Sequence, residues 1–264
     1  MFRNNKRKIR KAIPTISELT GIAAGTLTAY FLKSSSAGTT AGGFIQPVLA
    51  DFLNRMLSPM QEHRVLTVSA FAVDFIEKRL KDGEKLRDDG FFSEGTISRS
   101  DAVEVVDSML FTVEDDPQEQ KIPYMAHLIE NGCFDASIHP GLLHFLYKES
   151  KSLTYRQLCI LKLIIENKYP LSLKSTVETP WPTEEPRPML SKDTFPTLVE
   201  CVNLGHRGYI DYKLSSVDDT RSGPVALLVP HSMRSQVPAG QMYARMGLAD
   251  IPEDDVLPLA KSLS

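Results

Sequence analysis

The stretch LGHRGYIDYKL at residues 204–214 decides the fold of the C-terminal part of the chain. From Tyr209 to Leu214 apolar and polar side chains alternate, which predicts a β-strand. Asp218–Gly223 is rich in turn-forming residues, and the apolar run Val225–Val229 is expected to return as a second strand. Two predicted helices precede this hairpin, at residues 155–167 and 195–204. The order of two helices followed by a hairpin is that of a winged helix.

Upstream of this module, helix start signals and apolar periodicity predict a helical body. Ser58-Pro-Met-Gln61, Ser100 and Thr154-Tyr-Arg-Gln157 are typical N-terminal caps. Pro123 predicts a kink or a late start, and Gly132 and Gly83 are expected to end helices. The predicted body helices are residues 47–57, 59–81, 100–111, 118–130 and 140–148, and two more, near 238–247 and 253–262, close the chain.

The expected fold class is therefore mainly α, a helical body with a small C-terminal winged-helix-like α+β module. Three parts are expected: a basic arm and Gly-rich segment, a helical domain, and the winged-helix-like module. Prolines and Trp181 mark an insertion between the two helices of the module. The boundaries are residues 1–45, 46–152 and 153–264, with the insertion at 168–194.

The charge of the chain is divided unevenly. The formal net charge is −3, but the first 11 residues carry only basic side chains, and residues 12–264 carry 24 basic and 33 acidic groups. Such an arm is either a solvated tail or a contact for anionic lipid or nucleic-acid phosphate. The residues expected to contact lipid or phosphate are Lys6, Arg7, Lys8, Arg10 and Lys11.

A Gly-rich, weakly apolar segment follows the arm. Thr20–Leu32 is uncharged but short for a spanning helix, and Lys33 and three serines come next. Two small-x-x-x-small pairs place glycines on one helix face and predict close helix packing: Gly21, Gly25, Gly38 and Gly42. The alternatives are a linker, a helix packed on the body, a membrane-associated hairpin, or a signal peptide, which the scattered cysteines disfavour.

Four stretches resemble a family of uncharacterised bacterial proteins: LSPMQEHRV (57–65), DGEKLRDDGFF (82–92), DDPQEQKIPYMAHL (115–128) and LTYRQLCILKLI (153–164). The layout is also similar to that of abortive-infection alpha-type phage-resistance proteins, with a helical middle and a winged-helix-like end. The resemblance covers about residues 40–250 and carries no catalytic signature. It implies a membrane-associated N-terminal region and a role in phage defence, although the N-terminal segment is more polar here.

The residues predict no enzyme, no cofactor and no metal. No phosphate-binding loop, dinucleotide loop or nucleophile motif is present. His127, Cys133, His139 and His144 lack the short paired spacing of zinc ligands. The three cysteines, Cys133, Cys159 and Cys201, lie in apolar surroundings and fit buried, reduced thiols of a cytoplasmic protein. Five pairs of adjacent acids fit solvated charge or helix starts: Asp88–Asp89, Asp115–Asp116, Glu184–Glu185, Asp218–Asp219 and Asp254–Asp255.

Nucleic acid is disfavoured as a partner. The predicted recognition helix and its approach contain Asp193 and Glu200 without Lys or Arg, and the wing carries Asp218 and Asp219 against Arg221. We therefore expect a non-enzymatic interaction or sensor protein, cytoplasmic or at the inner face of the membrane. Its expected partners are an anionic membrane surface, an unknown protein or a second copy. The alternative is a winged-helix DNA-binding regulator.

Overall fold

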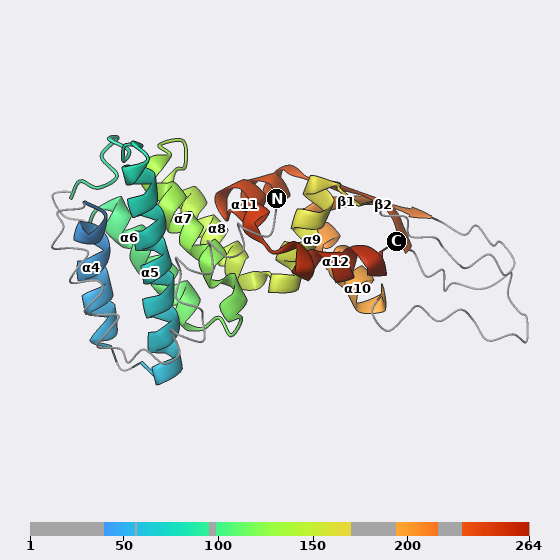
Figure 1. The fold of residues 1–264 in the computed structure, drawn as a ribbon, viewed down its shortest axis with the longest axis horizontal. Coiled ribbons are helices and arrows are strands. Elements are labelled where there is room, and N and C mark those ends of the chain that lie inside the picture. The colour runs from blue at the N-terminus through green and yellow to red at the C-terminus, as the bar shows by residue number, and fades with distance from the viewer. Residues whose placement is uncertain (1–39, 56, 95–98, 170–193, 216–228, 264) are drawn as a thin grey trace, which may run out of the picture. The chain divides into compact units, whose positions relative to one another are not determined.

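The structure is a computed structural model (Figure 1), which describes residues 40–55, 57–94, 99–169, 194–215 and 229–263. The described chain is mainly helical, with a two-stranded antiparallel sheet near the C-terminus, which confirms the predicted fold class. The chain divides into two compact units, residues 1–152 and residues 153–264. They are called the N-terminal unit and the C-terminal unit below.

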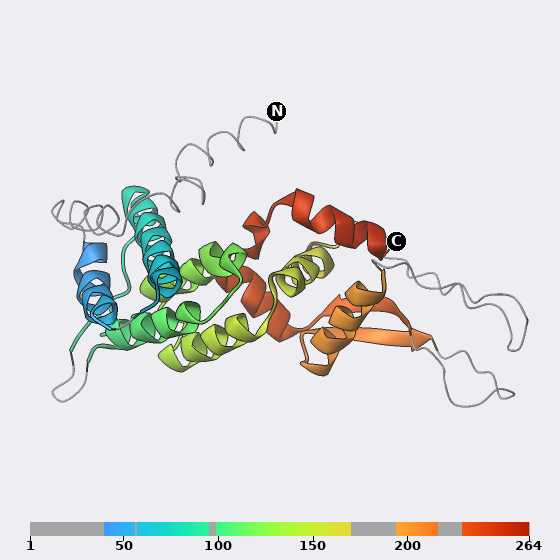
Figure 2. The same ribbon diagram turned by 90° about the horizontal axis from the view of Figure 1, so that it is seen from below.

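The N-terminal unit is a bundle of helices. Its longest helix, α5, packs on α4, α6 and α7, and α6 also packs on α8. Figures 1 and 2 show α4 at the edge of this bundle. The elements are α4 (Thr40–Leu53), α5 (Pro59–Lys81), α6 (Asp101–Glu114), the 3-10 turn η1 (Glu119–Lys121), α7 (Ile122–Phe134) and α8 (Pro140–Ser152).

Local caps start these helices where the sequence predicts. The Ser58 side chain accepts from the backbone N–H of Gln61, and the Gln61 side chain accepts from the backbone N–H of Ser58, which completes a capping box. The Ser100 side chain caps α6 by accepting from the backbone N–H of Val103, without a return bond from the Val103 side chain. Pro123 lies in the first turn of α7, where its missing N–H has no helical acceptor to lose, so the late start is confirmed.

Two predicted boundaries in this unit are wrong. The first helix is not confined to residues 47–57, because α4 begins at Thr40 and Ile45 is fully buried. Gly132 does not end α7 but lies buried inside it. A Cβ at that position would come within 2.8 Å of Leu143 Cδ1. The glycine therefore serves the close packing of α7 on α8 rather than helix termination.

The C-terminal unit is built around α9. That helix begins with the capping box of Thr154 and Gln157, ends at Asn167 in the left-handed conformation (φ 47°), and contacts α10, α11, α12 and β2. The elements are α9 (Tyr155–Glu166), α10 (Thr194–His206), β1 (Ile210–Ser215), β2 (Val229–Ser235), α11 (Val237–Arg245), the 3-10 turn η2 (Leu248–Asp250) and α12 (Glu253–Ser262).

The second strand that the structure describes shares only Val229 with the predicted one. β2 pairs with β1 from Ile210↔Ser235 to Ser215↔Val229, and residues 225–228 lie outside the described residues. Pro230 pairs with Leu214 beside a register shift, where a residue without an N–H is tolerated.

Candidate interaction surface on α10

Helix α10 buries one face in the C-terminal unit and leaves the opposite face exposed. Thr197, Leu198, Cys201 and Leu204 are buried. Pro196, Val199, Asn203 and His206 are exposed, and Val202 beside them is half-buried. The spacing of the four exposed residues follows the helical repeat, so they form one line along the helix. Val199 keeps 42% of its surface exposed, which is high for an aliphatic side chain.

The one acidic residue of α10, Glu200, does not belong to this exposed line. Its Oε2 accepts a hydrogen bond of 2.8 Å from Nε of Arg156 on α9, and its side chain is only 20% exposed. Burial raises the pKa of Glu200, and the Arg156 guanidinium opposes that rise. The sequence interpretation of an acidic helix surface is therefore wrong for Glu200; Asp193, Asp218, Asp219 and Arg221 lie outside the described residues.

The same arginine fixes α10 against the rest of the unit. A second nitrogen of Arg156, Nη2, donates to the hydroxyl of the buried Thr197. Thr197 Oγ1 also lies 3.1 Å from the Ser262 hydroxyl at the end of α12. Three helices thus meet at one side chain, so the exposed line is held on a rigid support rather than on a loop.

Basic and apolar side chains continue the surface beyond the end of α10. Arg207 is exposed, with its guanidinium 5.4 Å from the centre of the Tyr209 ring. The backbone N–H of Gln236 donates to Tyr209 O, which brings the end of β2 next to this turn. There Arg234 is exposed opposite Asp211, and Val237 is 76% exposed. The edge of the surface is therefore apolar with a small positive excess.

A buried lysine stabilises the C-terminal unit where α9 contacts η2. Lys162 of α9 is 3% exposed, and its ammonium donates to the carbonyls of Ala249 (2.8 Å) and Ile251 (2.7 Å). Glu166 and Glu253 lie 3.8 Å away and balance its charge. Buried charges are tolerated when they are paired and hydrogen-bonded in this way. Lys162 is thus committed to structure rather than to chemistry.

Three further side chains complete this network around the same carboxylates. Lys168 bridges Glu166 (2.5 Å) and Glu253 (3.2 Å). Tyr169 donates to Glu253 and Tyr243 donates to Glu166, both at 2.8 Å. The hydrogen bond from Tyr169 holds the pKa of Glu253 below its usual value, and burial together with Glu166 raises the pKa of Tyr243 to about 12. The carboxylates are therefore fully engaged.

In the N-terminal unit, Arg87 and Lys121 are committed to similar structural roles. Arg87 is 3% exposed, and its Nη1 donates to the carbonyls of Gly132, Asp135 and Ile138 at 2.9–3.2 Å. Lys121 pairs with Asp116 and donates to the carbonyl of Lys151 at 3.3 Å. Burial lowers the pKa of Lys121, and the Asp116 carboxylate opposes that shift.

The residues considered as metal ligands or nucleophiles are separated in the fold. His127 bonds Glu130 at 2.5 Å and stacks on Phe75, whereas His139 accepts from Gly141 and His144 lies 3.8 Å from Glu104. Burial raises the pKa of the Cys133 thiol, and it raises those of Cys159 and Cys201 to about 12. Within the described ranges, no three His, Cys, Asp or Glu side chains are grouped to hold a metal ion.

In the acid pairs that the structure describes, the carboxylates contact different partners. Asp89 pairs with Arg87, Asp115 with Lys151 and Asp116 with Lys121, and Asp255 accepts from Tyr155. Two pairs, Glu184–Glu185 and Asp218–Asp219, lie outside the described residues. At least one carboxylate of each described pair is therefore engaged in an ion pair or a hydrogen bond.

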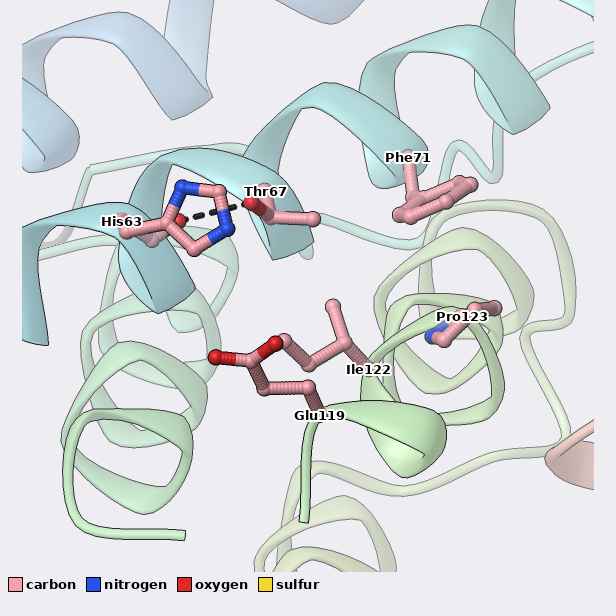
Figure 3. A pocket seen from close by; sticks show the side chains of 6 residues that line it. All are labelled: His63, Thr67, Phe71, Glu119, Ile122 and Pro123. Atoms are coloured by element: carbon pink, nitrogen blue, oxygen red, sulfur yellow. Dashed lines mark hydrogen bonds between the residues drawn. The ribbon is translucent and has the colours of Figure 1, made fainter. Parts of the chain in front are cut away.

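A shallow pocket lies between α5 and the start of α7 (Figure 3). Its cavity volume is about 10 Å³, and it is lined by His63, Thr67, Phe71, Glu119, Ile122 and Pro123. His63 and Glu119 lie at one end, and Phe71 and Pro123 lie at the other. The Thr67 hydroxyl donates to the carbonyl of His63 within α5. A cavity of this size holds about one water molecule, whereas sites for organic ligands usually exceed about 300 Å³.

The N-terminal residues expected to bind lipid or phosphate, together with Gly21, Gly25 and Gly38, lie outside the described residues. Gly42 lies in the first turn of α4. Among the helices that the structure describes, none combines the length and the apolar character needed to cross a membrane. The sequence predicted a binding role for the basic arm. It did not predict the exposed line on α10, because Glu200 was interpreted as an exposed charge.

No family model, no curated protein and no solved structure matches the chain.

Proposed function

We propose that the chain is a non-enzymatic interaction protein whose C-terminal unit docks another protein molecule on the exposed face of α10. The observation that carries the proposal is the pairing of Glu200 with Arg156, which leaves Pro196, Val199, Asn203 and His206 as an uncharged line on a supported helix. Exposed aliphatic side chains on a rigid element favour protein contact over solvent.

Charge favours a protein over nucleic acid as the occupant. Helix α10 contains no Lys or Arg, and residues 153–264 carry 12 basic and 13 acidic side chains. Affinity for nucleic acid depends largely on neutralising phosphates with Lys and Arg. The C-terminal unit offers little of that attraction. DNA binding remains the second candidate because Asn203, Arg207 and Arg234 are exposed around a helix that precedes a β-hairpin.

The basic arm supports a further part of the proposal, attachment of the chain to an anionic membrane surface. Six basic side chains without an acid occupy residues 1–11, and clusters of this kind bind acidic lipid headgroups. The layout similarity to abortive-infection alpha-type proteins is the reason for proposing phage defence as the process. Co-flotation with anionic and neutral vesicles tests the arm: the full chain should float only with anionic vesicles, and a chain lacking residues 1–11 with neither.

Photo-crosslinking in cells tests the α10 surface. A benzophenone amino acid replaces Val199 in the full chain, and a matched variant carries it at Met60, which is 53% exposed in the N-terminal unit. We expect a protease-sensitive, nuclease-resistant adduct at position 199 and none at position 60. A nuclease-sensitive adduct would favour the DNA-binding alternative, and equal labelling at both positions would remove the proposal.

A further inference from the structure

We draw no further inference here: the strongest candidate, the line of exposed side chains on α10 at Pro196, Val199, Asn203 and His206, belongs to the surface already described, and nothing in the described part of the chain shows what covers it.

Discussion

Nε of Arg156 lies 2.8 Å from Oε2 of Glu200, and this one pair turns the acidic residue of α10 away from the exposed face of the helix. It also links α9 to α10 across 44 residues of sequence. The surface character of α10 thus depends on a side chain from another helix, which makes Arg156 the first residue to vary.

Arg156→Gln should destabilise the C-terminal unit in a way that depends on pH. Burial already raises the pKa of Glu200 above 4.5, and loss of the guanidinium raises it further. The folded state then binds a proton more tightly than the unfolded state, so stability is retained below the unfolded pKa and lost as pH rises through the folded pKa. Urea unfolding should show a loss of about 1 kcal/mol near neutral pH and less in acid, since Arg156 is partly exposed. The added pH dependence should vanish in Arg156→Gln/Glu200→Gln.

Lys162→Met should cost about 3 kcal/mol of unfolding free energy, because the carbonyls of Ala249 and Ile251 lose their donor and two carboxylates lose a buried cation. Thermal unfolding followed by circular dichroism measures this. Lys168→Met removes an ammonium from the same network at a site that is 52% exposed, and its effect should be much smaller. Equal effects of the two changes would show that burial of Lys162 contributes nothing.

Arg87→Lys should destabilise the N-terminal unit by about 2 kcal/mol, although the charge is kept. A lysine cannot reproduce the planar guanidinium that donates to the carbonyls of Gly132, Asp135 and Ile138. Chemical denaturation gives the value. Arg99→Lys makes the same exchange at an exposed position and should stay within about 0.5 kcal/mol of the wild type.

Two glycine substitutions should have opposite signs. Gly132→Ala forces the buried Leu143 to move, because its Cδ1 would lie 2.8 Å from the new Cβ, and should cost about 1 kcal/mol. Gly240→Ala in α11 meets nothing within 4 Å and should gain about 0.5 kcal/mol from helix propensity. Melting temperatures of both variants are compared with the wild type. A stabilised Gly132→Ala would mean that α7 and α8 separate readily.

Features governed by neighbouring residues could be predicted from the sequence. The caps at Ser58, Ser100 and Thr154 join groups three residues apart, so the pattern alone fixes where α5, α6 and α9 begin. The interior residues Val65, Val68, Ala72 and Ile76 follow from helical periodicity and are buried. The mainly helical fold class follows from the same short-range rules.

Features governed by residues far apart in the chain could not be predicted from the sequence. A glycine such as Gly132 commonly ends a helix, yet the approach of Leu143 from α8 makes it an interior packing position. The apolar run at Val225–Val229 did not indicate that the strand continues to Ser235, which pairs with Ile210. A local sequence pattern contains no information about which other part of the chain will pack against it.

By itself, the sequence determined the helix starts, the apolar faces, the separation of a basic arm from an acidic body, and the absence of familiar catalytic motifs. Only the tertiary structure decided which charges remain on the surface. Glu200, Lys162 and Arg87 look alike in the sequence as charged residues of helices and loops. Their partners, Arg156 and the carbonyls of Ile251 and Gly132, lie 44, 89 and 45 residues away. The energy of a charge depends on burial and on opposite charges nearby, and folding alone brings those groups together.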